Sequence, residues 1–144
     1  MTKRGVRIRR WRPEDLGAIV ACQKAAWPEY PEGEQYGRRT FQLAFAAFPE
    51  GQLLAEVDGQ VVGYATSVIV DMPAPLEEYS FDELTGRGTF STHTMAGDTL
   101  YGADIGVDPA WRGQRIAAKL YAARKRILEK HNLRRMVAFG RLPG

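Results

Sequence analysis

The fold can be deduced outward from one segment, which reads Asp104-Ile105-Gly106-Val107-Asp108-Pro109-Ala110-Trp111-Arg112-Gly113-Gln114-Arg115-Ile116-Ala117. Its apolar first part is typical of a strand, its Asp-Pro pair of a tight turn, and the glycine and arginines that follow of a helix start. The first turn of a helix leaves about four backbone N–H groups unpaired beside the positive end of the helix dipole. The segment therefore predicts a helix N-terminus that binds a phosphate or pyrophosphate, with Gly113 allowing a close approach to the backbone.

Two familiar phosphate-binding patterns are absent from this segment. The Walker pattern needs Gly-Lys-Ser/Thr, which the segment lacks. The glycine pattern for dinucleotides belongs after the first strand of a doubly wound sheet, whereas this segment lies near the end of the chain. We therefore expect neither a bare nucleoside triphosphate nor a nicotinamide cofactor.

A long amphipathic helix is predicted over residues 113–132, followed by a strand over residues 133–139. The apolar stripe of the helix consists of Ile116, Leu120, Ala123 and Ile127, at spacings of four, three and four. The consecutive residues Arg124-Lys125-Arg126 point to different sides of a helix, so we interpret them mostly as a solvated face. Two strands joined by such a crossover helix must be parallel neighbours in one sheet.

The residues before this segment predict a strand, two helices and a hairpin. Asp58-Gly59 is the strongest short-range hairpin signal in the chain and makes its flanking strands antiparallel. The predicted elements are a strand over 6–11, helices from Pro13 to near Pro28 and over 34–48, strands over 52–57 and 60–70, and a strand over 99–107. Residues 71–98 form a loop with at most a short helical turn, and a loop of this length is expected to be functional. The order β-α-α-β-β-loop-β-α-β predicts a single domain over residues 1–144, of mixed α/β class, with helices on both faces of a mixed sheet.

Composition indicates one globular domain. The chain has 144 residues, of which 26% are charged and 44% hydrophobic. Cys22 is the sole cysteine and the histidines are His93 and His131, so we expect no disulfide and no metal, and we interpret Cys22 as a buried, inert thiol. No apolar run approaches about 20 residues and the N-terminus lacks a signal peptide, which predicts a cytoplasmic protein with no membrane partner.

Charge is distributed unevenly along the chain. The formal net charge is +3, but residues 1–108 carry ten basic and sixteen acidic groups, whereas residues 109–144 carry ten basic groups and only Glu129. The C-terminal part is therefore expected to meet an anion, such as a phosphorylated ligand. Nucleic acid is disfavoured as a partner, because the aromatic residues are not interleaved with the basic ones as a stacking platform requires.

The sequence GVDPAWRGQRIAAKLY, starting at Gly106, resembles the acetyl-coenzyme A site of the GNAT (GCN5-related) N-acetyltransferases. The family pattern is Arg/Gln-x-x-Gly-x-Gly/Ala after a strand that ends in an aliphatic residue. Residues Arg112, Gly113, Gln114, Ile116 and Ala117 are in register with this pattern. Arg115 replaces its central glycine. The predicted element order also matches the family, so the resemblance covers nearly the whole chain and implies a GNAT-like acyltransferase fold.

The resemblance implies acetyl-CoA as cosubstrate. The backbone of Ile105, Gly106 and Val107 would pair with the pantetheine arm, and an N–H of Gly106 or Val107 would polarise the thioester. The pyrophosphate would lie on the loop formed by Arg112, Gly113, Gln114, Arg115, Ile116 and Ala117. We expect helical φ/ψ at Arg115, which leaves its guanidinium able to contact a phosphate.

The activity implied is direct transfer of the acetyl group to a primary amine of a small molecule or peptide. Such a transfer needs a base, because an ammonium has no lone pair. The candidates are Asp104, Tyr101 on the same strand, and His93 in the preceding loop, while a strand-end Asp104 that pairs with an arginine remains the alternative. In the family, the loop between the first two helices borders the acceptor site, so the resemblance implies acceptor contacts for Trp27 and Tyr30.

The family normally continues beyond the strand near residue 139 with a helix and a final pair of strands. The chain ends at Gly144, so it looks truncated relative to the family. Its ending also resembles the point at which some GNAT-like domains lead into a carbon-nitrogen hydrolase domain. We therefore expect either the N-terminal domain of a longer protein or a short domain completed by a second subunit, for example in a homodimer. A non-catalytic CoA-binding regulatory or docking domain is the rival interpretation.

Overall fold

The protein is described by a computed structural model that covers residues 5–29 and 37–138. Five strands form one sheet in the order β1-β2-β3-β4-β5. The pair β4–β5 is parallel and the other three pairs are antiparallel, which confirms the predicted mixed sheet. The strands are β1 (Arg7–Arg10), β2 (Leu53–Val57), β3 (Gln60–Val70), β4 (Thr99–Val107) and β5 (Arg135–Ala138).

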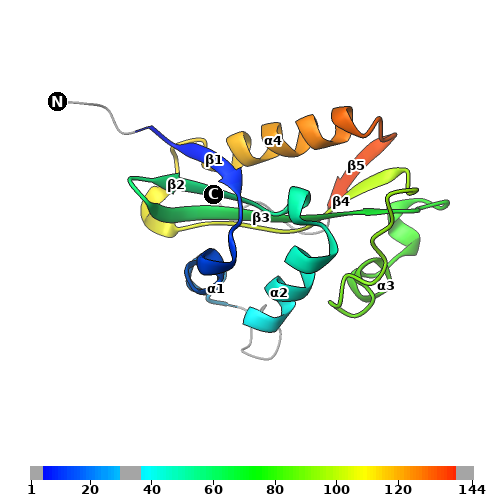
Figure 1. The fold of residues 1–144 in the computed structure, drawn as a ribbon, viewed down its shortest axis with the longest axis horizontal. Helices are drawn as coiled ribbons and strands as arrows, with labels where there is room; N and C mark the ends of the chain where they lie inside the picture. The colour runs from blue at the N-terminus through cyan, green and yellow to red at the C-terminus, as the bar shows by residue number, and fades with distance from the viewer. Residues whose placement is uncertain (1–4, 30–36, 139–144) are drawn as a thin grey trace.

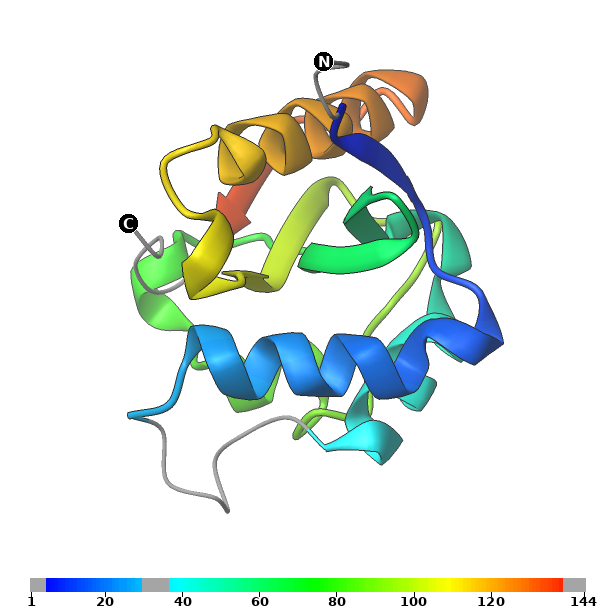
Figure 2. The same ribbon diagram turned by 90° about the vertical axis from the view of Figure 1, so that its left-hand side faces the viewer.

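Helices cover both faces of this sheet. α4 (Ile116–Lys130) lies on one face, and α1 (Leu16–Ala26) and α2 (Arg38–Ala47) lie on the other (Figure 1). Figure 2 shows the sheet between these two layers, with α1 running below it and α4 above it. The mixed α/β fold expected from the sequence is thus confirmed. Part of the predicted second helix, together with Tyr30, lies outside the described residues.

The Asp58-Gly59 turn joins β2 to β3 as predicted. Asp58 has a φ of 50° and Gly59 a φ of 81°. Two successive positive φ values are the signature of a type I′ turn, whose twist matches that of the flanking strands. The predicted hairpin and its antiparallel pairing are therefore confirmed, and the structure adds the turn type.

The long loop holds more regular structure than predicted. Besides the 3-10 turn Leu76–Glu78, it contains α3 (Phe81–Thr85), whereas we expected at most a short helical turn. A reciprocal capping box stabilises the start of α3, because Ser80 Oγ accepts from the Glu83 N–H and Glu83 accepts from the Ser80 N–H, each at 3.1 Å. Gly86 ends the helix with a φ of +62°, which suits a glycine.

Each face of the sheet has its own apolar core. On the α4 face, Ile116, Leu120 and Ile127 are buried against the sheet. On the other face, the Phe41 ring lies edge-on to Trp11 at 5.5 Å and to Tyr64 at 5.7 Å between ring centroids. Such pairs add to the burial of the aromatic surface. No helix among the described residues is long and apolar enough to cross a membrane.

Strand β4 has two irregularities that shape the site. Thr66 faces Asp104 while its neighbour Ser67 faces Gly102, so Ala103 is the extra residue of a β-bulge. On its other edge, β4 pairs with β5 from Thr99 to Gly102. Beyond that point, residues 104–107 have no β5 partner within the described part of the chain. Among the described residues, the second half of β4 therefore presents an open edge of the sheet.

Candidate active site

The predicted phosphate loop connects β4 to α4, and its backbone differs from expectation. Arg115 has a φ of 62° and a ψ of 26°, so it is left-handed and forms the N-cap of α4, which begins at Ile116. Our expectation of helical dihedrals at Arg115 is wrong. The chain turns into the helix through a left-handed residue, which disfavours a Cβ by roughly 1–2 kcal/mol. This explains why the family pattern has a glycine at this position.

A cavity of about 250 Å³ opens beside this loop. It is lined by Val107, Trp111, Arg112, Gly113, Arg115, Ile116 and Ala117. Gly113 also has a positive φ, of 82°, and a Cβ built there would meet no atom within 4 Å. The loop therefore combines exposed backbone, two arginines and the N-terminus of a 15-residue helix, the features that bind an anion.

The Arg112 side chain is held by the end of α1. Its Nη2 donates to the Ala26 carbonyl oxygen at 2.9 Å. That carbonyl lies in the last turn of α1, where helix carbonyls lack partners within the helix. The Arg112 guanidinium thus ties the predicted phosphate loop to the helix on the other face of the sheet.

Trp27 lies directly after α1 and bonds to the open edge of β4. Its Nε1 donates to the Ile105 carbonyl at 2.9 Å, and its side chain is buried. The Ile105 N–H donates to Asp104 Oδ1 at 2.9 Å. Ile105 is opposite Ala65 on β3, but its N–H bonds to Asp104 and its C=O bonds to Trp27. Both backbone groups of Ile105 therefore face the open edge and not β3. By alternation, Val107 also faces this edge and Gly106 faces β3.

Asp104 is the carboxylate at this edge. Its Oδ2 accepts a hydrogen bond of 2.7 Å from the Tyr64 hydroxyl. Burial raises the pKa of Asp104 to about 7, although the bonds from Tyr64 and the Ile105 N–H and the charge of Arg124 oppose this rise. A carboxyl group with a pKa near 7 is divided between its acid and base forms at neutral pH and can accept a proton there.

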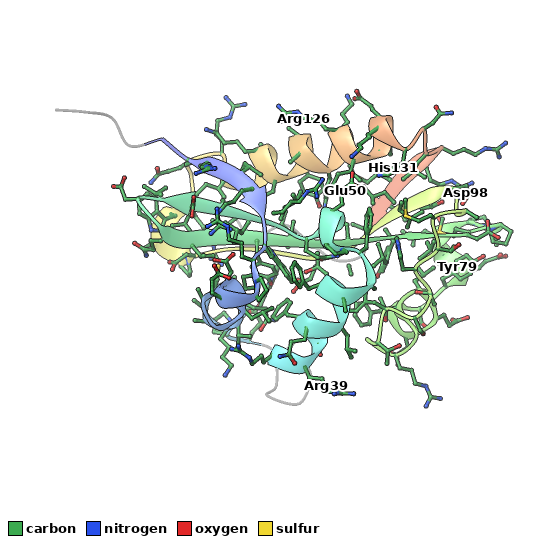
Figure 3. All side chains as sticks on the ribbon, in the orientation of Figure 1. Arg39, Glu50, Tyr79, Asp98, Arg126 and His131 are labelled. Atoms are coloured by element: carbon green, nitrogen blue, oxygen red, sulfur yellow. The ribbon has the colours of Figure 1, made fainter. Side chains whose placement is uncertain are left out.

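The other two candidate bases lie in different surroundings. Tyr101 is fully buried on β4, and its pKa is raised by burial and by the Asp104 charge. His93 stacks on Phe48 at 4.5 Å between ring centroids, and its Nδ1 accepts from the Ile69 N–H at 3.0 Å. Burial lowers the pKa of His93. The structure therefore brings Tyr101 near Asp104, while His93 belongs to the cluster around Phe48, on the side of Glu50 and His131 (Figure 3).

The structure contradicts the predicted exposure of Arg124. We expected it on a solvated face, but it is 1% exposed, while Lys125 and Arg126 are exposed. Arg124 follows Leu120 by four residues and precedes Ile127 by three, so it continues the buried stripe of α4, where Ala123 is only partly buried. This spacing was the available signal. Tyr64, which holds Asp104, was also missed because a tyrosine in an apolar strand resembles any core residue.

Metal-binding and thiol chemistry have little support in the described residues. No group of three or more His, Cys, Asp or Glu side chains is placed to hold a metal ion among them. Cys22 is buried in α1, as predicted, and burial raises the pKa of its thiol to about 12. A thiol so rarely ionised is a poor nucleophile.

Comparisons with known proteins agree with this geometry. The model of the acetyltransferase (GNAT) family matches residues 18–142. Two proteins of Bacillus subtilis (strain 168) are similar in sequence. "Probable hydrolase YhcX" is 29% identical over 136 residues, which are 94% of this chain and 26% of that protein. "Uncharacterized N-acetyltransferase YkwB" is 26% identical over 137 residues, 94% of this chain and 61% of that protein. The chain spans about a quarter and about three-fifths of these two relatives.

Solved structures share the fold. The loading GNATL domain of CurA from Lyngbya majuscula has a TM-score of 0.77 at 18% identity, covering 93% of this chain and 64% of that one. The GphF GNAT-like decarboxylase in complex with isobutyryl-CoA has a TM-score of 0.67 at 26% identity, covering 81% and 58%. A GNAT family acetyltransferase from Brucella melitensis in complex with acetyl-CoA has a TM-score of 0.62 at 22% identity, covering 96% and 77%.

Proposed function

The chain belongs to the acetyltransferase (GNAT) family, and from this premise we propose that it transfers the acetyl group of acetyl-CoA directly to a primary amine. The observation that carries the proposal is the position of Asp104. Its carboxyl group, with a pKa near 7, lies at the point where the edge of β4 becomes open. A base is thereby on the strand along which, by the family resemblance, the coenzyme would bind.

The residues of the chain fit acetyl-CoA. The open edge offers the N–H and C=O of Val107 to the pantetheine arm, and the Val107 N–H is the better candidate to polarise the thioester because Gly106 faces β3. The loop from Arg112 to Ala117 offers backbone N–H groups and guanidinium groups to the pyrophosphate. The relatives from Brucella melitensis and the GphF system are described with acetyl-CoA and isobutyryl-CoA, which supports this assignment.

In the proposed reaction, Asp104 receives the proton that the acceptor ammonium must lose. The neutral amine nitrogen then attacks the thioester carbonyl carbon, the carbon–sulfur bond breaks, and the second proton lost by the nitrogen ends on the departing sulfur, so the products are an amide and CoA. Tyr101 stays the second candidate for proton transfer. The indole N–H of Trp27 donates to the Ile105 carbonyl, so any contact between Trp27 and the acceptor amine would be made by its ring. Tyr30 lies outside the described residues.

The test is release of CoA from acetyl-CoA across a panel of amines, with Asp104→Asn as the decisive variant. Loss of a general base lowers kcat by about 10² to 10⁴-fold. Acetyl-CoA affinity in calorimetry should stay close to that of the unmodified protein. Asp71→Asn is the matched control, because Asp71 is exposed and makes the same charge change. Full activity of Asp104→Asn would remove Asp104 from the mechanism.

Decarboxylation of a carboxyacyl-CoA is the second candidate, because the GphF relative, at 26% identity, is described as a GNAT-like decarboxylase. In that reaction the acyl carboxylate leaves as CO₂, the electron pair moves into the thioester enolate, and a protonated Asp104 donates to the carbon. Including malonyl-CoA in the panel separates the two candidates by CO₂ release without an amine. Binding of CoA without either reaction would favour the docking-domain alternative.

We also propose that this GNAT-like domain works as part of a longer protein. The support is that each Bacillus subtilis relative is longer than the matched part, and that one of them is called a probable hydrolase. Comparing the amine panel for residues 1–144 with that for the natural full-length protein tests this. Equal activity of the two forms would contradict a need for further residues.

A further inference from the structure

α4 carries a buried arginine on the face of the sheet opposite to the candidate base. We propose that Arg124 is a positioning residue of the acetyl-transfer site: it holds the bulge of β4 in place and so determines where the Asp104 carboxyl group and the open edge of β4 point. The part of this inference that concerns catalysis rests on the proposed function. Its structural part, the control of Asp104 by Arg124, can be tested without any activity.

Three hydrogen bonds attach Arg124 to the bulge. Its Nη2 donates to the Thr66 carbonyl at 2.9 Å and to the Asp104 carbonyl at 2.7 Å. Its Nε donates to Ser67 Oγ at 2.9 Å. Thr66 and Ser67 are the two residues of β3 between which the register shifts. One guanidinium therefore joins both strands at the irregularity itself.

The bulge requires a donor of this kind. An extra residue in one strand interrupts the ladder, so that carbonyls next to it lose their usual backbone N–H partners. A buried carbonyl without a partner is costly, and here the planar fork of one guanidinium serves two carbonyls at once. Tyr121, one turn earlier on α4, lies 5.3 Å from the guanidinium carbon, measured to the ring centroid.

Gly102 makes the room for this guanidinium. A Cβ at Gly102 would lie 2.7 Å from Nη1 and 2.9 Å from Cζ of Arg124. Any other residue at this position would therefore displace the side chain. The arginine and the glycine form one arrangement, in which the backbone of β4 lies directly against the charged group.

The bulge changes which face of the sheet Asp104 occupies. In a regular strand, side chains two residues apart point to the same face. The extra residue Ala103 reverses this, so that Asp104 points toward Tyr64 on the α1 side, although Gly102 two residues earlier faces Arg124 on the α4 side. Without the bulge, the carboxyl group would point toward α4.

Arg124 also acts on Asp104 by its charge. The titratable and charged groups that act on or are acted on by this carboxyl group are Tyr64 from β3, Tyr101 from β4, Cys22 from α1 and Arg124 from α4. Arg124 is the sole cation among them in the described chain. Burial raises the pKa of Asp104, and the charge of Arg124 lowers it, in addition to the hydrogen bonds from Tyr64 and from the Ile105 N–H.

The experiment titrates Asp104 by carbon-detected NMR in the unmodified protein and in Arg124→Met, Arg124→Lys and the control Arg126→Met. Arg126 lies exposed on the outer side of α4 (Figure 3). Arg124→Met should raise the pKa of Asp104 by roughly one unit, because a nearby opposite charge lowers the pKa of a carboxyl group and the charge of Arg124 acts in that direction on Asp104. Arg124→Lys keeps the charge but cannot make all three hydrogen bonds. The pKa of Asp104 should therefore stay close to its original value, while the Ile105 amide signal should shift. Arg126→Met should change neither.

Activity then reports on the catalytic meaning. Arg124→Met should lower kcat at pH 7 about fivefold or more, because a rise of the Asp104 pKa by about one unit reduces its ionised fraction at pH 7 from about a half to about a tenth. The rise of kcat should move to higher pH. The KM for acetyl-CoA should change by less than about threefold, because the phosphate loop is unaltered. If Arg124→Met does not fold, Ser67→Ala removes one bond to the guanidinium and Gly102→Ala displaces it, and both should shift the Ile105 amide signal. Unchanged Asp104 pKa and Ile105 signals in the folded variants would overturn the proposal. A protein inactive on every amine, with these shifts present, would instead overturn the proposed function.

Discussion

Replacing Arg115 by glycine separates backbone strain from side-chain charge in the coenzyme loop. Arg115 has a φ of 62° at the N-cap of α4, and its side chain is exposed. A non-glycine residue in this conformation is disfavoured by roughly 1–2 kcal/mol. Glycine removes that strain but gains freedom in the unfolded chain, worth about 0.5–1 kcal/mol. We therefore expect Arg115→Gly to be equal to or up to about 1 kcal/mol more stable than the unmodified protein.

Arg115→Ala and Arg115→Val complete the series. Alanine keeps the strain and loses the side chain, so it should be about 1 kcal/mol less stable than the glycine variant, or roughly 3 °C lower in Tm for a chain of this size. Valine should be lower still, because β-branching makes a positive φ worse. Chemical denaturation measures the order. If alanine were more stable than glycine by about 0.5–1 kcal/mol, as at an ordinary helical position, Arg115 would not be left-handed and the account of the loop would fail.

The same variants show how the loop binds acetyl-CoA. If backbone N–H groups hold the pyrophosphate, Arg115→Gly should bind acetyl-CoA in calorimetry at least as well as the unmodified protein. If the guanidinium contacts a phosphate, glycine and alanine variants should both lose about 1.5–3 kcal/mol, the usual value of a hydrogen bond to a charged group. The two results are distinct, so one series of titrations decides between backbone and side chain.

Two further predictions concern Asp104 and Trp27. Because Asp104 must be ionised to act as a base, kcat should rise with pH through about 7 and level off above it, as a pH–rate profile would show, and a profile flat between pH 5.5 and 8.5 would contradict this role. The pKa of Asp104 is higher in the folded state than in the unfolded state, so its contribution to the free energy of unfolding is fully present below about pH 4 and is lost as the pH rises through 7. Asp104→Asn should therefore stabilise the protein at pH 8 by up to about 4 kcal/mol, and by much less at pH 4. Trp27→Phe removes the bond to the Ile105 carbonyl and should cost about 1 kcal/mol of stability in denaturant titration, while an unchanged midpoint would indicate that water replaces the indole N–H.

The strands that position the site could be predicted because their signals are local. The predicted bounds 99–107 and 60–70 coincide with β4 and β3, since both strands are apolar runs ended by turn residues. The Asp58-Gly59 pair indicated the hairpin and its antiparallel strands. The start of α4 was placed three residues early, because Gly113 and Arg115 look compatible with a helix until their φ values are known.

The bulge of β4 could not be predicted from its own residues. A bulge depends on register between two strands, and nothing in Gly102 to Asp104 shows that β3 has one residue fewer to match. Its partner residue was equally hidden, because a stripe chosen by hydrophobicity passes over an arginine even at the right spacing. Ile116, Leu120, Arg124 and Ile127 also fit one face of the helix, and it is Arg124, not Ala123, that is fully buried on it. A cation that is buried on such a stripe needs hydrogen-bond acceptors on the element that faces it. Here one of these acceptors belongs to Asp104, so the residue that sequence analysis placed in solvent is the one bonded to the backbone of the candidate base.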